Sequence, residues 1–124
     1  MLRKTLQLSF LVILIAVAAQ IGSAQKTVRV RFARGAHQGT QTGVIKGYAT
    51  VKYVFGVGAG QHVKVKLRSA NPSLYFTFNE GGGEVTEWEG DVRETGDYTV
   101  TVFLMRSAAR RGTIANYSLT IYAH

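Results

Sequence analysis

The sequence contains no cysteine, so no disulfide can hold the chain together and metal sites built on thiolates are excluded. It has a single proline, Pro72, which leaves backbone N–H groups free to join β-ladders almost everywhere. Acidic residues are also scarce, and all seven lie between Glu80 and Asp97. Stability must therefore come from a non-covalent core, and the charge is unevenly distributed along the chain.

Only the amino end carries a long hydrophobic run. Arg3 and Lys4 precede an unbroken apolar stretch, residues 11–19, which small residues at 22–24 follow. This order predicts a secretory signal peptide over residues 1–24, cleaved after Ala24. The run is too short for a stable membrane span, and no cysteine follows it to accept a lipid. We expect one exported domain, residues 25–124, without membrane insertion after cleavage.

The rest of the sequence alternates apolar and polar residues with a period of two, and no window shows a helical period. One example is HVKVKLR at 62–68, whose valines and leucine face one way and whose basic residues face the other. Turn signals separate the runs at 56–61, 69–73, 79–84, 94–97 and 106–113. The pattern predicts an all-β fold, an antiparallel β-sandwich of about eight strands. We expect GVGAGQ, 56–61, to be a hairpin turn, and 106–113 to form the tip of another.

Basic residues dominate the mature chain. Without Arg3 and Lys4 it keeps 13 basic and 7 acidic residues, a formal charge of +6, and the nine basic residues from Lys26 to Arg68 have no acid among them. This segregation predicts a basic face, an acidic loop region and an anionic partner. Nucleic acid is disfavoured as that partner, because the protein is exported and its basic residues alternate with core positions. A role at a membrane surface would need an amphipathic helix, which the sequence lacks.

Two surface features are candidates for binding a partner. In GVIKGYATVKYVF, 43–55, strand parity puts Tyr48 on the outer side with Lys46, Thr50 and Lys52. Tyr48 either covers strand backbone, follows a bulge at Gly47 that changes the register, or anchors a partner.

The second feature is RSAARRGT, 106–113, with Arg106, Arg110 and Arg111. These arginines either solubilise the loop or bind an anionic group, and no acid lies within eight residues to neutralise them. The small residues 107–109 would let such a loop enter a narrow cleft.

Catalytic and metal patterns are weak. The histidines at 37, 62 and 124 lack the paired spacing of a metal site, and no serine or threonine has a nucleophile context. Glu87 and Glu89 have the composition of a glycosidase pair, but we interpret them as a solvated acidic edge near Trp88. We expect no enzyme activity, no cofactor and no metal.

Five stretches carry a family resemblance: VRVRFARG, GVIKGYATVKYVF, GAGQHVKVKL, TGDYTVTVF and LMRSAARRGTIANYSLTI. Together they resemble the periplasmic inhibitors of g-type lysozyme from Gram-negative bacteria, with IKGY and R-x-x-A-R the more specific parts. The GAGQ and TGDYTV pieces are also similar to bacterial pre-peptidase C-terminal sandwich domains.

The resemblance implies an eight-stranded periplasmic sandwich that places loops into the glycan-binding groove of g-type lysozyme. We expect the protein to be a monomer. The contact residues it implies are Tyr48, Arg106 and Arg110, and we add Arg111, where the chain departs from the family pattern. The alternative is a non-inhibitory binding module for an envelope glycan or protein, with Trp88, Tyr75 and Tyr122 as a sugar-stacking platform.

Overall fold

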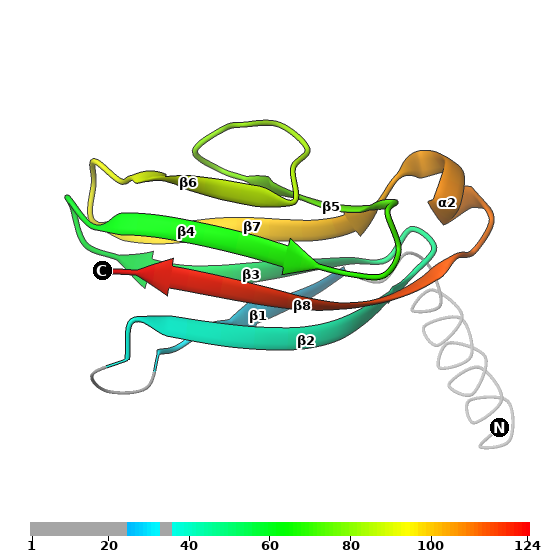
Figure 1. Ribbon diagram of the computed structural model, residues 1–124, viewed down its shortest axis with the longest axis horizontal. Helices are drawn as coiled ribbons and strands as arrows, with labels where there is room; N and C mark the ends of the chain where they lie inside the picture. The colour runs from blue at the N-terminus through cyan, green and yellow to red at the C-terminus, as the bar shows by residue number, and fades with distance from the viewer. Residues whose placement is uncertain (1–24, 33–35) are drawn as a thin grey trace, which may run out of the picture.

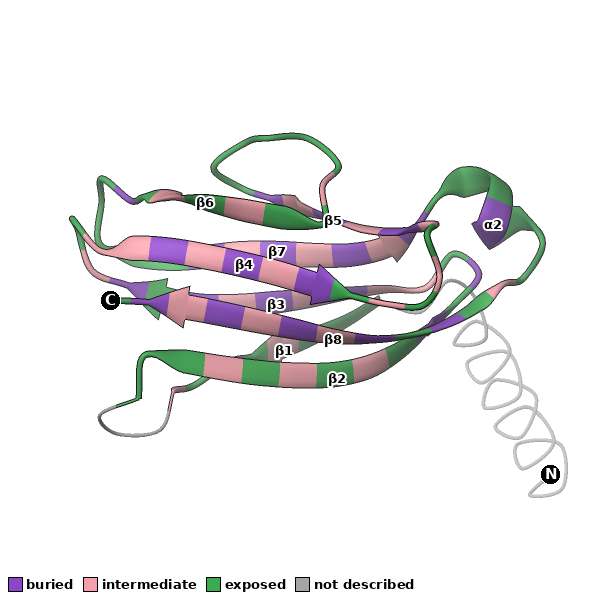
Figure 2. Ribbon diagram, in the orientation of Figure 1, coloured by how far each residue is buried: buried purple, intermediate pink, exposed green. Residues whose placement is uncertain are grey.

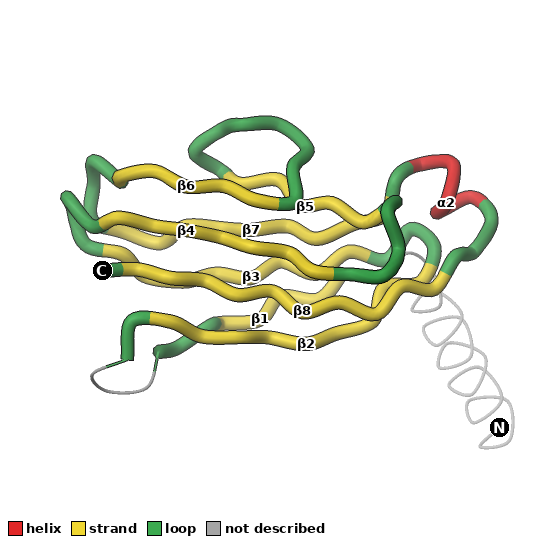
Figure 3. Tube along the Cα trace, in the orientation of Figure 1, coloured by secondary structure: helices red, strands yellow, loops and turns green. Residues whose placement is uncertain are grey.

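The computed structural model describes residues 25–32 and 36–124, so the predicted signal peptide, 1–24, lies outside the described residues. The described chain folds into strands and one short helix (Figures 1 and 3). In chain order the elements are β1 (Gln25–Arg29), β2 (Gln38–Lys46), β3 (Thr50–Val57), β4 (His62–Arg68), β5 (Leu74–Phe78), β6 (Glu87–Asp91), β7 (Gly96–Leu104), α2 (Arg106–Arg110) and β8 (Ile114–Ala123).

The strands form two four-stranded sheets that pack face to face (Figure 1). The first sheet has the order β1-β3-β7-β5 and the second the order β2-β8-β4-β6. All pairs are antiparallel except β1 with β3. The predicted all-β antiparallel sandwich of about eight strands is therefore confirmed, with one parallel pair at an edge.

Odd-numbered strands lie in the first sheet and even-numbered strands in the second, so consecutive strands never pair. The prediction of hairpins at 56–61 and 106–113 is wrong, because both segments cross from one sheet to the other. Alternation along a strand shows which face is buried, but it does not reveal which sheet the strand joins. The crossovers after β2, β4 and β7 gather at one end of the sandwich, which we call the α2 end (Figure 1).

The core faces follow the predicted alternation. On β4 the side chains of Val63, Val65 and Leu67 are buried, and Lys64 and Lys66 point outward (Figure 2). The largest fully buried side chains come from both sheets and include Phe55, Phe76, Leu74, Leu119 and Ile121. Burial of these faces between the sheets provides the main stabilisation, since no covalent cross-link is present.

Two tyrosines join the sheets inside the core. Tyr53 of β3 and Tyr117 of β8 share a 2.6 Å hydrogen bond between their hydroxyls, with the rings nearly perpendicular at 80°. Burial, together with this hydrogen bond, raises the pKa of Tyr117 well above its ordinary value. Gly43 lies opposite Tyr117 in the β2–β8 pair, and a Cβ there would lie 2.5 Å from the Tyr117 hydroxyl. A glycine at 43 is therefore required to accommodate the tyrosine ring.

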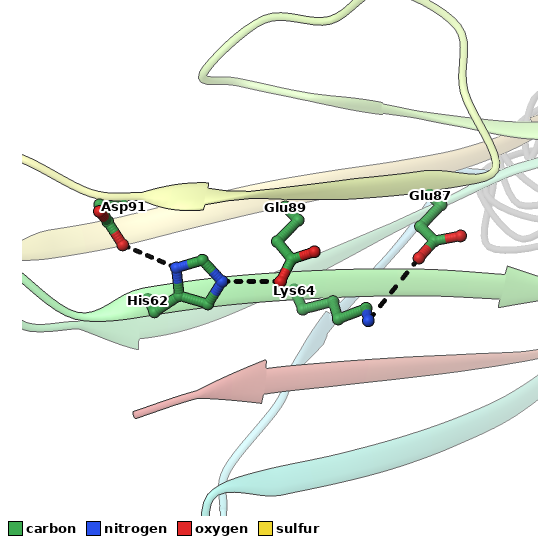
Figure 4. Close-up of polar contacts among 5 residues, drawn as sticks. All are labelled: His62, Lys64, Glu87, Glu89 and Asp91. Carbon is green, nitrogen blue, oxygen red and sulfur yellow. Dashed lines mark hydrogen bonds and ion pairs between the residues drawn. The ribbon is translucent and has the colours of Figure 1, made fainter.

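Charged residues hold the edge strand β6 to β4 (Figure 4). His62 contacts Asp91 through Nδ1 at 2.7 Å and Glu89 through Nε2 at 2.8 Å, and Lys64 Nζ lies 3.9 Å from Glu87. Both imidazole nitrogens can donate only when the ring is protonated, so Glu89 and then Asp91 raise the pKa of His62. The three carboxylates of β6 are thus paired with basic side chains of the neighbouring strand.

Replacement of Gly43 by alanine should destabilise the fold by about 1–3 kcal/mol, because the new methyl group would overlap the buried Tyr117 side chain. Urea unfolding of Gly43→Ala and of the control Gly96→Ala measures this effect. Gly96 has open space around it and no left-handed backbone, so its variant should unfold like the wild type. Equal stability of the two variants would contradict the packing argument.

The His62 contacts should make stability depend on pH. The pKa of His62 in the folded protein lies above its unfolded value of about 6.5. The resulting stabilisation is complete below about pH 6.5 and is lost as the pH rises through the pKa of the folded protein. The melting temperature of the wild type should therefore exceed that of His62→Gln by more at pH 5.5 than at pH 8.5. A gap of the same size at both values would exclude a titrating contribution from His62.

Candidate functional site

Tyr48 lies in a tight turn at the α2 end. Residues 46–49 join β2 to β3, with the Ala49 N–H donating to the Lys46 carbonyl at 3.1 Å. Gly47 occupies the first central position at φ +60°, a left-handed conformation that glycine adopts without strain. The Tyr48 side chain is 58% exposed. Its predicted exposure is confirmed, but its placement on a strand face is wrong because the strand ends at Lys46.

The arginine segment forms a single helical turn, α2, where the sequence predicted a loop. Ala109 N–H donates to the Met105 carbonyl at 2.8 Å. The helix ends in a Schellman motif: the Gly112 and Thr113 N–H groups donate to the carbonyls of Ala109 and Ala108, at 3.0 and 3.1 Å. Gly112 has φ +70°, which this motif requires. Five residues are too few to show a helical period in the sequence.

Ala108 and Ala109 anchor α2 to the sandwich. Their exposed fractions are 1% and 4%, and both belong to the hydrophobic core. The small side chains at 107–109 were expected to let a projecting loop enter a narrow cleft. Because Ala108 and Ala109 are buried in the core, that expectation is wrong for these two residues. Arg106 and Arg110 remain exposed, one helical turn apart on the same side of α2, and Arg111 follows as the exposed C-cap residue.

The three site arginines form no ion pair within 4.0 Å in the part of the chain that the structure describes. The four described ion pairs are Arg29 with Asp97, His62 with Glu89, His62 with Asp91, and Lys64 with Glu87. The acidic residues of these pairs all come from β6 or β7. The positive charge at the α2 end therefore stays available to a partner.

The Tyr48 turn lies against the chain segment that ends α2. Gly47 N–H donates to the Thr113 carbonyl at 2.9 Å, and a Cβ on Gly47 would lie 3.5 Å from the Ala109 carbonyl oxygen. An open cleft of about 750 Å³ lies beside this contact. Tyr48 and Arg106 both line it, whereas Arg110 and Arg111 do not. We call it the Tyr48–Arg106 cleft.

Two further residues of this cleft were missed by sequence reasoning. Phe103 of β7 lines it together with Thr50, on the outer face of the first sheet. Glu84 lines it from the β5–β6 connection, where the adjacent Val85 pairs with Phe76 at the sheet edge. The sequence carries no signal for Glu84, because it reaches the cleft only through the pairing of the adjacent Val85 with Phe76 at the sheet edge.

The competing interpretations find little support. Tyr75 and Tyr122 lie on the outer faces of different sheets, while Trp88 packs inward against Phe78 with ring centroids 4.4 Å apart. These aromatics therefore form no common platform for a sugar. Glu87 and Glu89 contact Lys64 and His62, as expected for a solvated edge.

Within residues 25–32 and 36–124, no three His, Asp or Glu side chains are arranged to hold a metal ion. The same residues include no helix long and apolar enough to cross a membrane.

The chain matches no protein-family model and no curated protein sequence, but it is similar to several solved structures. PliG of Aeromonas hydrophila, a periplasmic lysozyme inhibitor of g-type lysozyme, is 30% identical with a TM-score of 0.76, and the match covers 83% of this chain and 100% of that one. PliG of Salmonella Typhimurium is 26% identical with a TM-score of 0.66, over 80% of this chain and 98% of that one.

A more distant likeness extends to the fold alone. The pre-peptidase C-terminal domain of Bacillus anthracis collagenase is 12% identical with a TM-score of 0.52, over 80% of this chain and 95% of that domain.

The PliG proteins are inhibitors rather than enzymes, which agrees with the function class predicted from the sequence. The chain is 30% identical to the Aeromonas hydrophila protein and matches its whole length. It therefore belongs to the PliG family of periplasmic lysozyme inhibitors.

Proposed function

We propose that this protein inhibits g-type lysozyme in the periplasm by placing its α2 end, with the exposed Tyr48 and Arg106, in the enzyme's substrate groove. The observation that carries the proposal is that Tyr48 and Arg106, distant in sequence, line one open cleft in a member of an inhibitor family. Their side chains are exposed, and the guanidinium of Arg106 has no carboxylate within 4.0 Å in the described structure.

The chemistry of the target suits these groups. Lysozymes hydrolyse glycosidic bonds with carboxyl groups set in a groove that accepts a sugar chain. A guanidinium binds a carboxylate through two parallel charge-assisted hydrogen bonds, which an ammonium group does not reproduce. In the proposed complex Arg106 and Arg110 bind acidic or carbonyl groups of the groove, and Arg111 contacts its outer edge. The Tyr48 ring packs against the rim, and substrate is excluded by occupancy.

The rigidity of the α2 end favours tight binding. The buried alanines, the Schellman motif and the Gly47–Thr113 hydrogen bond fix the backbone of both contact segments before a partner arrives. Of the conformational freedom of these segments, only that of the side chains then remains to be lost on association. One chain presents one such cleft, so a monomer is the proposed inhibitory unit.

Removal of the arginines should weaken inhibition sharply. Arg106→Ala and Arg110→Ala should each raise the inhibition constant about 30- to 800-fold, the range for a buried interface arginine worth about 2–4 kcal/mol. Arg106→Lys should recover only part of the loss. Inhibition of a g-type lysozyme acting on peptidoglycan is the measurement, with Arg93→Ala as the control at an exposed arginine in the β6–β7 connection. A wild-type protein inactive at micromolar concentration would exclude the proposed function, and a fully potent, folded double variant would exclude only these contacts.

Disruption of the C-terminal cap of α2 should weaken inhibition, because the cap holds the arginines in position. Gly112→Ala places a Cβ on a left-handed residue, which costs about 1–2 kcal/mol, so the melting temperature should fall and inhibition should weaken. Asparagine tolerates this conformation better, and Gly112→Asn should lose less of both properties. Full potency and unchanged stability of Gly112→Ala would show that the cap does not fix the site.

A further inference from the structure

Exposed hydrophobic side chains gather at the α2 end. Among the described residues the large apolar side chains that remain exposed are Val44, Tyr48, Met105 and Ile114, with exposed fractions of 58%, 58%, 43% and 60%. Each lies in or beside a crossover at the α2 end (Figure 1). Exposed apolar residues scattered singly are ordinary, but a group at one end of a small domain indicates a binding surface.

Val44 and Ile114 form the part of this group that the cleft does not include. Both point outward from the second sheet, because the neighbouring Ile45 and Ala115 are buried. Val44 pairs with Asn116 and Lys46 with Ile114, so Val44 and Ile114 are diagonal neighbours, typically about 7–8 Å apart. We call these two residues the β2–β8 patch.

A shallow hollow of about 690 Å³ adjoins the patch. It is lined by Thr42, Gly43, Val44, Arg68, Asn116 and other residues of the second sheet and the β4–β5 connection, and none of the lining residues is acidic. Exposed Lys46 and Arg68 border the patch with positive charge. The surface therefore fits a partner with apolar groups in the middle and carboxylates or carbonyls around them.

The patch and the Tyr48–Arg106 cleft open on opposite outer faces of the sandwich, and both lie beside the α2 end. Lys46 directly precedes Gly47, and Ile114 directly follows Thr113. The Gly47 N–H donates a hydrogen bond to the Thr113 carbonyl. A standard interface takes about 800 Å² from each partner, far more than one tyrosine and one arginine provide. An enzyme groove that takes up the α2 end would therefore extend over both outer faces of the sandwich. The second sheet offers exposed apolar groups there, whereas Phe103 and Tyr75 on the first sheet are half-buried.

We infer that the β2–β8 patch is a second contact area for the same g-type lysozyme. This inference rests on the proposed function. The patch lies outside the cleft that carries Tyr48 and Arg106, so its apolar contacts govern how tightly the enzyme is held and which g-type lysozymes fit. Occlusion of the substrate groove remains the role of the arginines.

The test is the double variant Val44→Thr with Ile114→Thr, which keeps β-branched side chains and removes apolar surface. Its dissociation constant for g-type lysozyme should rise about tenfold or more. Val54→Thr, the same change on the outer face of the first sheet, should stay within about twofold of the wild type. Thermal unfolding checks that each variant is folded.

A second measurement does not depend on the double variant. The chain has no cysteine, so Val44→Cys and Val54→Cys each accept one environment-sensitive dye. Lysozyme should shield the dye at 44 and leave the dye at 54 exposed. If the wild type inhibits but the double variant binds within about twofold and the dye at 44 stays exposed, the patch is not a contact area and the proposed function stands. If the wild type neither binds nor inhibits, both proposals fail.

Discussion

The hydrogen bond from the Gly47 N–H to the Thr113 carbonyl is the contact on which the arrangement of the site depends. It joins the turn that carries Tyr48 to the end of the helix that carries the arginines, although the two segments follow strands of different sheets. Because consecutive strands alternate between the sheets, the crossovers after β2 and β7 reach the same end of the sandwich. Gly47 supplies the left-handed backbone that this turn requires.

Non-covalent packing must supply the rigidity that a disulfide would give. The Tyr53–Tyr117 hydrogen bond is the buried polar link between the sheets, and Gly43 leaves room for it. A hydroxyl pair satisfied internally avoids the cost of an unpaired buried polar group, and it favours one alignment of the two faces over others of similar apolar area. The α2 end inherits this alignment, since β3 and β8 begin directly after the two contact segments.

Period-two alternation predicted the strands and their buried faces, as at Val63, Val65 and Leu67, and strand parity predicted the exposure of Tyr48. Sheet membership was not predictable in the same way, so both supposed hairpins are crossovers. The turn of α2 is held by Ala108 and Ala109 in the core and by Gly112, a tertiary effect that five residues of sequence do not reveal. Glu84 reaches the cleft only because Val85 pairs with Phe76. Of the seven acids in the segment predicted as a separate charged region, four form ion pairs with basic neighbours: Glu87, Glu89, Asp91 and Asp97.

That pairing changes how the charge of the protein acts. His62 and Lys64 offset carboxylates of β6, and Arg29 offsets Asp97, so these pairs leave much of the positive charge to the α2 end, where Lys46, Arg68 and the site arginines are exposed. Charges at the surface are screened within about 10 Å at ordinary ionic strength, so the bulk charge of the chain contributes little to the energy of a formed complex. The binding energy must then come from short-range contacts at a rigid end: guanidinium groups against carboxylates or carbonyls, and an exposed tyrosine with apolar neighbours against the rim of a groove.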